Sequence, residues 1–197
     1  MKKVLATAFI GILLPVMLID AQASAPCADY ARGDGSRENP YHVSTSAQLD
    51  GIDECEAGQD KFFIQTNDIF LDERAISISE LNGGYDGDGH RIVGLRSDEV
   101  PVGSQGETAS GLFPELKSAT LSNLTLVKPY PDSASYAGAF FGRAYDSELS
   151  NLKVIGGEVR PVLSPSATPH AIFGGSIGGI MFGGSMSESS AVGTYFN

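Results

Sequence analysis

The sequence predicts an all-β fold: a short right-handed parallel β-solenoid, which is a β-helix-like stack of coils, with an N-terminal cap segment. Glycine is frequent, at 24 of 197 residues, and indicates many tight turns between short strands. No segment sustains a helical apolar period, which disfavours a helical solenoid. A Leu-Ser-Asn-Leu segment at 121–124 returns at 149–152, and such internal repeats are typical of stacked coils. A Greek-key sandwich of short strands is the alternative.

The start of the chain has the pattern of a secretory signal peptide, which we assign to residues 1–25. Lys2 and Lys3 form a charged n-region, residues 4–19 are almost entirely apolar, and Ala23-Ser24-Ala25 supplies a small-residue cleavage site. The apolar run is short for a transmembrane helix, and no second long run follows, so we expect no membrane span in the mature chain. The sequence therefore predicts export to the periplasm, the cell surface or the medium.

An excess of acidic residues narrows the classes of partner. Aspartate and glutamate together number 24 against 13 lysines and arginines, which gives a formal net charge of -11. Such a surface repels phosphate backbones, so we expect no nucleic-acid partner. The hydrophobic fraction of 42% is too high for a disordered acidic tail.

Residues 26–80 are predicted to form the N-terminal cap segment. Cys27 and Cys55 are the two cysteines of the chain, and two cysteines in an exported protein favour a single disulfide. Ser44 or Ser46 is the expected cap of a short helix. The expected elements are a strand at 41–43, that helix at 47–52, two short strands within 61–71 separated by a kink at Asn67-Asp68, and a strand at 75–78.

Residues 81–197 are predicted to hold the stacked coils. A dense turn signal, Asp86-Gly87-Asp88-Gly89-His90, precedes a strand-like Arg91–Leu95. The repeat pairs a short apolar piece with a following one in three copies, which are 111–113 with 121–126, 139–141 with 149–154, and a degenerate 178–181 with 186–192. Apolar positions repeated in this way would form interior ladders, and equivalent backbones would pair in parallel.

Four groups of residues, in this order, resemble the GLUG repeat family of bacterial surface and secreted proteins. They are Gly33–Ser36 with Asn39–Tyr41 and Gln48-Leu49, Phe62–Ile69, Tyr85–Ile92 with Leu95, and Gly111–Phe113. The resemblance covers most of residues 33–193 and implies a β-helix-like domain associated with adhesion or extracellular attachment. Pro114 and the small residues at 187–191 depart from the family pattern. GLUG repeats also precede the catalytic domain of immunoglobulin A protease-like metallopeptidases, but this sequence contains no His-Glu-x-x-His, so protease activity does not carry over.

The turn Asp86-Gly87-Asp88-Gly89 has the composition of a calcium-binding loop. Counted from Asp86, an EF-hand needs Gly at the sixth and Glu at the twelfth position, where this chain has Arg91 and Ser97. We therefore expect a tight turn in which Gly87 and Gly89 take positive φ, with His90 as part of the same motif. No cofactor is expected beyond weakly bound Ca²⁺.

The predicted function is binding without catalysis. We expect an extracellular protein or carbohydrate ligand, recognised on an exposed strand face or by the loops 96–110, 127–137 and 160–172. Exposed aromatic residues are the usual anchors of such a surface, and Tyr130, Tyr136 and Tyr145 are the candidates. A secreted carbohydrate-active enzyme on the same scaffold, a polysaccharide lyase or hydrolase, is the alternative; no spacing in the sequence singles out two acids at the separation that hydrolysis needs.

The C-terminal coil raises a further expectation. The sequence ends at Tyr195-Phe196-Asn197, in or just after the third copy of the repeat, without a recognisable capping segment. Solenoids normally carry polar caps, so an open coil predicts self-association or a missing partner. The third hypothesis follows from the same observation, namely that the chain is a piece of a longer surface protein.

Overall fold

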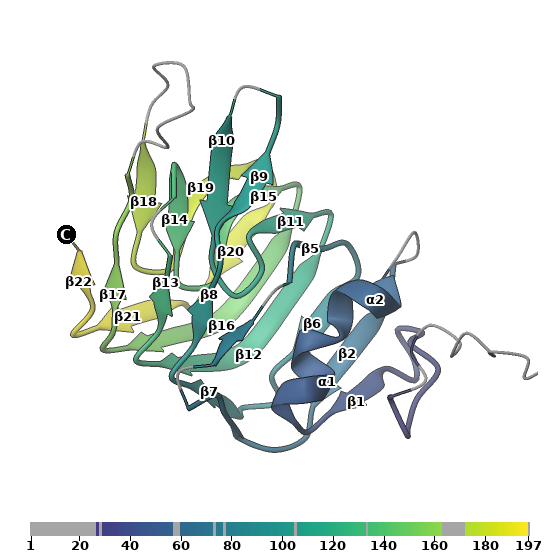
Figure 1. Ribbon diagram of the computed structural model, residues 1–197. Helices are drawn as coiled ribbons and strands as arrows, with labels where there is room; N and C mark the ends of the chain where they lie inside the picture. The colour runs from purple at the N-terminus through teal and green to yellow at the C-terminus, as the bar shows by residue number, and fades with distance from the viewer. Residues whose placement is uncertain are drawn as a thin grey trace, which may run out of the picture.

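Short β-strands make up most of the described part of the chain, and nearly all of them pair in parallel (Figure 1). The computed structural model describes residues 27, 29–56, 60–72, 74–76, 78–104, 106–132, 134–162 and 172–196. The predicted signal peptide and most of the expected loop 160–172 lie outside these ranges. The all-β prediction is confirmed, with two short helices near the N-terminus. Neither helix within these ranges is long and apolar enough to cross a membrane.

The first elements within the predicted cap segment 26–80 are strand β1 (Tyr41–Val43) and helices α1 (Ser46–Asp50) and α2 (Ile52–Glu56). The single predicted helix is thus two helices, and neither expected serine caps it. The N-cap is Thr45, whose Oγ1 accepts a 3.2 Å hydrogen bond from the Gln48 amide. Leu49 and Ile52 are fully buried, so the two helices cover one end of the strands behind them (Figure 1).

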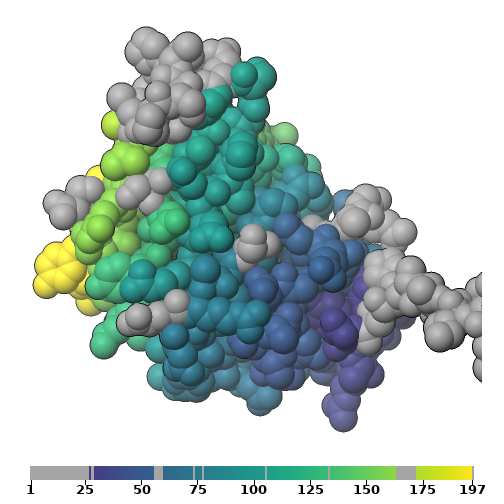
Figure 2. All heavy atoms as spheres, in the orientation of Figure 1, coloured from purple at the N-terminus to yellow at the C-terminus, as the bar shows by residue number. Residues whose placement is uncertain are grey.

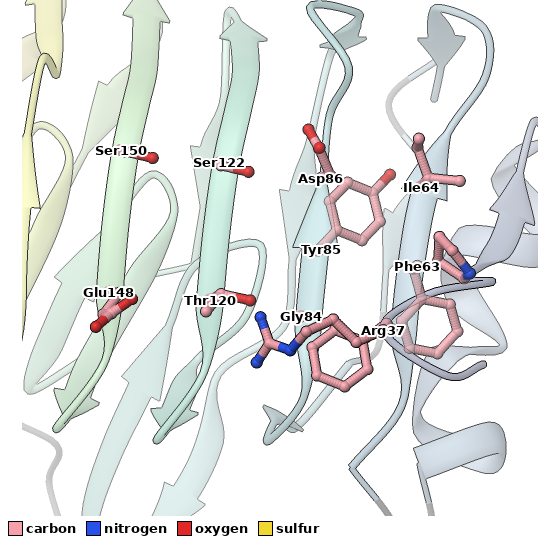
Figure 3. Close-up of a pocket in the computed structure, with 12 residues that line it drawn as sticks. Arg37, Phe63, Ile64, Gly84, Tyr85, Asp86, Thr120, Ser122, Glu148 and Ser150 are labelled. Carbon is pink, nitrogen blue, oxygen red and sulfur yellow. The ribbon is translucent and has the colours of Figure 1, made fainter.

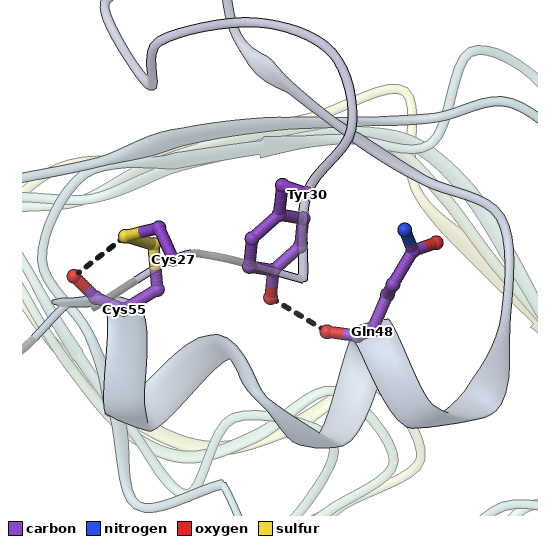
Figure 4. The surroundings of a disulfide bond; sticks show 4 residues. All are labelled: Cys27, Tyr30, Gln48 and Cys55. Carbon is purple, nitrogen blue, oxygen red and sulfur yellow. Dashed lines mark hydrogen bonds between the residues drawn. A yellow bond between two sulfur atoms is a disulfide. The ribbon is translucent and has the colours of Figure 1, made fainter. Parts of the chain in front are cut away.

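A disulfide between Cys27 and Cys55 ties the beginning of the described chain to α2 (Figure 4). Close to it, the Tyr30 hydroxyl donates a 2.6 Å hydrogen bond to the carbonyl oxygen of Gln48. The Tyr30 ring also stacks on Tyr41 of β1, with the ring centroids 5.0 Å apart. These contacts hold the N-terminal segment, the helices and the first strand together.

The strands that follow fall into five successive sets, which we call rungs I to V. Strands of one rung pair with strands of the rung before it. Rung I holds β2 (Phe62–Gln65), β3 (Ile69–Phe70), β4 (Ala75–Ile76) and β5 (Glu80–Leu81). Rung II holds β6 (Gly84–Asp86), β7 (Arg91–Val93), β8 (Arg96–Ser97), β9 (Val100–Val102), β10 (Glu107–Ser110) and β11 (Glu115–Lys117). Rung III holds β12 (Thr120–Val127), β13 (Tyr130–Pro131), β14 (Tyr136–Gly138) and β15 (Phe141–Tyr145). Rung IV holds β16 (Glu148–Ile155), β17 (Glu158–Val159), β18 (Phe173–Gly175) and β19 (Gly178–Phe182), and rung V holds β20 (Ser185–Ser187), β21 (Ser190–Val192) and β22 (Tyr195–Phe196).

Strands of successive rungs lie side by side in shared sheets. The wide sheet has the order β1-β2-β6-β12-β16-β20, with β3, β7 and β21 paired along it, and smaller sheets have the orders β5-β11-β15-β19, β4-β8-β13, β9-β10-β14-β18 and β17-β22. All these pairings are parallel except the hairpin of β9 with β10. The predicted register of the repeat is confirmed, because Leu121 pairs with Leu149 and Leu124 with Leu152. Met186 of the degenerate third copy then pairs with Leu149.

The core consists of columns of side chains to which each rung contributes one residue. Phe63, Tyr85, Leu121 and Leu149 form one column of the wide sheet, and each is at most 1% exposed. This follows from the alternation of strand side chains, which sends every second residue into the interior. A polar contact is buried with them, since the Tyr85 hydroxyl donates a 2.9 Å hydrogen bond to Oε1 of Gln65. Burial raises the pKa of Tyr85 above its ordinary range, so this hydroxyl stays a donor.

The rungs bend at the same places because residues with left-handed backbone lie in register. Asn123 and Asn151, in consecutive rungs, have φ of 53° and 52°. Asparagine tolerates this conformation better than other residues with a side chain. Two further columns with positive φ are Ser118, Asp146 and Gly183, and Lys128, Gly156 and Gly193. The left-handed residue at a bend is therefore a glycine in some rungs and a residue with a polar side chain in others.

Two of the expected loops contain strands. Residues 96–110 hold β8, β9 and β10, and residues 127–137 hold β13 and the start of β14. These segments are short and contain proline or serine, so strand formation depends on the neighbouring rung that supplies the pairing partner. The strand expected at 75–78 is β4, and residue 77 lies outside the described residues.

Candidate functional site

A groove crosses the outer face of the wide sheet, with a volume of about 310 Å³ (Figure 3). We call it the sheet groove and define it by its outward-facing residues Arg37, Phe62, Ile64, Gly84, Asp86, Thr120, Ser122, Glu148 and Ser150. Strands β2, β6, β12 and β16 supply all of them except Arg37, which comes from the segment before β1. The groove therefore runs across four rungs.

Parallel register produces the groove from residues that are far apart in the sequence. One row of paired positions consists of Phe62, Gly84, Thr120 and Glu148. The next row, two residues further along each strand, consists of Ile64, Asp86, Ser122 and Ser150. Neighbouring strands lie about 4.8 Å apart, so each row forms a continuous line of side chains across the sheet. The rows together present an aromatic ring, hydroxyl groups and carboxylates on one face.

Gly84 creates the hollow in the first row. A Cβ at this position would lie 2.5 Å from Oγ1 of Thr120 and 2.7 Å from Cδ1 of Phe62. Both distances are below ordinary contact, so any side chain here would displace its neighbours. Because Gly84 has none, the Phe62 ring lies across the strand and forms the floor of the groove beside Thr120.

Arg37 covers the aromatic end of the groove. Its guanidinium carbon lies 4.4 Å from the centroid of the Phe62 ring, in cation–π geometry. The segment that carries Arg37 is held by Asp34, whose carboxylate accepts hydrogen bonds of 2.9 Å from the Ser36 amide and 3.2 Å from Nδ2 of Asn39. These bonds, those to Ser36 first, lower the pKa of Asp34 to about 2.

The acidic turn adjoins the groove and has a structural role. Oδ1 of Asp86 accepts 2.9 Å hydrogen bonds from the Asp88 amide and from Nδ2 of Asn123. Gly89 has φ of 79°, as expected, but the other left-handed residue is Asp88, at 47°, and not Gly87. Gly87 is needed for a different reason, since a Cβ there would lie 2.5 Å from the carbonyl oxygen of Asn123.

The His90 backbone amide closes this turn with a 2.8 Å hydrogen bond to the carbonyl oxygen of Gly87. Across the described residues, no three or more His, Cys, Asp or Glu side chains are grouped to hold a metal ion. Weak binding of Ca²⁺ at this turn stays a prediction.

The three candidate tyrosines do not form one surface. Tyr136 is 8% exposed, stacks on Phe173 with centroids 5.6 Å apart, and donates a 3.3 Å hydrogen bond to Oε1 of Glu107. Burial is the main cause that raises the pKa of its hydroxyl. The expectation that Tyr136 is an exposed contact is therefore wrong, because packing between consecutive rungs encloses its ring. Tyr130 is 42% exposed and belongs to a different sheet.

Tyr145 is half-buried beside Arg143. The guanidinium carbon of Arg143 lies 5.6 Å from the Tyr145 ring centroid and 5.1 Å from that of Tyr136, and the guanidinium forms an ion pair with Glu115. Tyr145 also stacks on Phe182 of the next rung, at 5.1 Å between centroids. These two tyrosines therefore take part mainly in contacts between rungs. The sheet groove was missed by the sequence prediction, although Arg37 and Phe62 stand in or beside the segments that resemble GLUG repeats.

The fold is thus that of an all-β protein with parallel sheets built rung by rung and a groove on its widest face. No family model matches the chain. Halomucin of Haloquadratum walsbyi is 28% identical over 162 residues, which cover 75% of this chain and 2% of halomucin. A candidate immunoglobulin A1 protease from Bacteroides ovatus has a similar solved structure, with a TM-score of 0.51 and 17% identity. That alignment covers 83% of this chain and 60% of the Bacteroides chain, and the likeness is one of fold.

Proposed function

We propose that this chain is a right-handed parallel β-solenoid module of an extracellular or surface protein, and that its sheet groove binds carbohydrate without catalysing a reaction. The observation that carries the proposal is the row of Phe62, Thr120 and Glu148 beside the row of Asp86, Ser122 and Ser150. A sugar has a rim of hydroxyl groups, which bond to hydroxyls and carboxylates, and an apolar face, which would pack on the part of the Phe62 ring that lines the groove, since Arg37 already covers one face of that ring.

The position of the groove favours a ligand that is bound through side chains and not through backbone hydrogen bonds. It lies on the face of a sheet whose backbone amides and carbonyls are engaged in pairing between strands, so an extended peptide could not add to it as a further strand. Serine, threonine and carboxylate side chains remain, and these both donate to and accept from sugar hydroxyls. Arg37 at the rim would pair with a carboxylate, which favours a polysaccharide that contains uronic acid.

The two acids of the groove support binding over hydrolysis. Asp86 and Glu148 lie two strands and two residues apart in register, so their backbones are roughly 12 Å apart on standard strand spacings. Glycosidases place their carboxyl groups about 5–10 Å apart, which side chains on these backbones could reach, so the separation by itself does not decide. What favours binding is that Oδ1 of Asp86 already accepts hydrogen bonds from the Asp88 amide and from Nδ2 of Asn123. A carbohydrate-active enzyme on this scaffold is the alternative, and the cleft with two acids is the feature it would use.

Several observations support the extracellular setting. The chain matches halomucin, contains a disulfide, and begins with a predicted signal peptide. The likeness to the Bacteroides structure agrees with placing the chain among GLUG-type repeat proteins. An attachment role for the whole protein is part of the proposal, since this chain spans 2% of halomucin.

Affinity electrophoresis and calorimetry against a panel of neutral and uronate-containing polysaccharides test the proposal. We expect at least one polysaccharide to bind, and Phe62→Ala and Ser122→Ala to weaken that binding about tenfold through lost stacking or hydrogen bonding. Lys153→Ala is the matched control, because Lys153 is exposed on β16 outside the groove.

The same samples distinguish the competing functions. Failure of the whole panel to bind, or equal binding by all the variants, contradicts a glycan site in the groove. New reducing or unsaturated ends after incubation would instead establish the enzyme. Circular dichroism of each variant separates loss of the site from loss of the fold.

A further inference from the structure

A second hollow lies on the outer face of the wide sheet, beside β1, the first strand of that sheet. It has a volume of about 380 Å³, and we call it the β1 hollow. The segment before β1, in purple, lies at the surface of the molecule in Figure 2, on the flank opposite the yellow last rung. The β1 hollow is defined by Arg32, His42, Ser44, Gln48, Thr66 and Asn67.

The β1 hollow continues a row of the sheet groove. His42 pairs with Ile64, the residue that begins the second row of the groove, and this row ends at Ser150. Val43 is buried, so the alternation of a strand places its neighbour His42 on the outer face. From β1 to β16 the row crosses five strands, which is roughly 19 Å on standard strand spacings. One extended ligand could therefore contact both hollows.

The lining of the β1 hollow is basic, although the protein is acidic. Arg32 and His42 are basic residues and no lining residue is acidic, whereas the whole chain has a net charge of -11. Arg32 is exposed and His42 is half-buried. A cationic hollow on such a protein attracts an anionic group and concentrates it locally.

Nearby acids do not neutralise this lining. Asp34, the acid nearest to Arg32 in the sequence, accepts its hydrogen bonds from Ser36 and Asn39 within its own turn. Asp68 follows the last lining residue, and its carboxylate pairs with Arg91, at 2.6 Å between Oδ2 and the guanidinium. Both carboxylates are therefore engaged by groups outside the hollow.

Hydrogen bonds within the lining hold its walls. Oε1 of Gln48 accepts bonds of 2.9 and 3.0 Å from the amide and the hydroxyl of Ser44. Within the described part of the chain, the side chains of Arg32, His42 and Asn67 make no hydrogen bond or ion pair, so their N–H groups are available to a ligand. Arginine only donates and an ionised carboxylate only accepts, and the planar guanidinium can bond to both carboxylate oxygens at once.

We propose that the β1 hollow binds a carboxylate of an acidic polysaccharide whose chain also occupies the sheet groove. This inference rests on the proposed function of the groove and names its ligand more closely, as a polymer that repeats uronate along its length. Arg32 and Arg37 then contact two different acidic sugars of one chain. Because the second contact is intramolecular, the polymer binds more tightly than a short uronate that reaches one hollow.

Calorimetry with polygalacturonate, digalacturonate and fully methyl-esterified polygalacturonate tests the β1 hollow. We expect the charged polymer to bind more tightly than digalacturonate and more tightly than the esterified polymer, which lacks the carboxylates. Arg32→Gln and His42→Gln should each weaken binding of the charged polymer about tenfold. Arg160→Gln is the matched control, because it removes the same charge from an exposed arginine after β17 and should leave binding unchanged.

The groove variant Phe62→Ala distinguishes failure of this inference from failure of the proposed function. If Phe62→Ala weakens binding of the charged polymer but Arg32→Gln and His42→Gln do not, the β1 hollow is not part of the site and the groove stands. If digalacturonate binds as tightly as the polymer, the chain that spans both hollows is wrong. If no uronate binds, the β1 hollow is overturned, and neutral polysaccharides then decide the groove. Circular dichroism of each variant checks the fold.

Discussion

Asn151 donates a 3.0 Å hydrogen bond from its Nδ2 to Oδ1 of Asn123, its counterpart in the preceding rung. Asn123 in turn donates from Nδ2 to Oδ1 of Asp86 at 2.9 Å. Both asparagines have left-handed backbone. One residue type thus supplies both the bend of the rung and a hydrogen bond between rungs. These two hydrogen bonds form a ladder that ends at Asp86, one of the two acids of the sheet groove.

The ladder gives the first prediction. Asn151→Ala should lower the free energy of unfolding by about 1–2 kcal/mol, because an alanine in the left-handed region is strained. Asn151→Gly should cost less, since glycine adopts this conformation freely and loses only the hydrogen bond. Urea denaturation measures both. Equal losses in the two variants would show that the hydrogen bond and not the backbone conformation matters.

The change of exposure along one column gives the second prediction. Leu149→Ala should lower the free energy of unfolding by about 2–5 kcal/mol, because it opens a cavity in a filled core. Met186→Ala, one rung later in the same column, should cost less than about 1 kcal/mol in dilute protein, since that side chain is already half-exposed. Urea denaturation of both variants compares the two. A large loss for Met186→Ala would mean that rung V is covered in solution.

The disulfide gives the third prediction. Cys27 and Cys55 are 28 residues apart, and cross-linking a loop of this size stabilises the folded state by about 3.5 kcal/mol on the chain-entropy argument. A reductant should therefore shift the urea midpoint down. The double variant Cys27→Ser/Cys55→Ser should start from the lower midpoint and be insensitive to the reductant. If reduction leaves the midpoint of the native chain unchanged, the helical cap is held by its packing alone.

The Asp34 carboxylate gives the fourth prediction. Its pKa is lowered from the ordinary 3.8 to about 2, so its stabilising contribution is complete above 3.8 and is lost as the pH falls through about 2. An NMR titration should place the chemical-shift transition of the Asn39 side-chain amide near pH 2. Asp34→Asn removes the titrating group and should abolish that transition. A midpoint near 3.8 would show that the bonds to Ser36 and Asn39 do not form in solution.

The position of the repeat could be predicted because it depends on residues that recur at a fixed interval. Leu121 and Leu149 have the same neighbours in the sequence, and their pairing follows once equivalent backbones stack. The separation of β2 from β3 at Asn67-Asp68 is equally local, since turn-forming residues interrupt an apolar run. The two cysteines left a single intramolecular pairing to consider, and the structure contains that bond.

The site could not be predicted in the same way. Tyr136 is an aromatic residue in a segment rich in serine and proline, which suggests exposure, yet the rings and backbones of adjacent rungs enclose it. The sheet groove joins Arg37 to Glu148, and no local pattern links them. Gly84 resembles the other turn glycines in sequence, but its importance comes from the Phe62 ring and the Thr120 side chain on either side.

The sequence by itself therefore determined the strands that recur, the register in which they stack and the turn at Asp86–His90, because these depend on residues near one another in the chain. Only the tertiary structure decided which aromatic rings are enclosed, that two of the expected loops, 96–110 and 127–137, contain paired strands, and that Phe62, Asp86 and Glu148 share one groove. The physical reason is that burial and side-chain neighbours are set across rungs, between residues that the sequence keeps far apart.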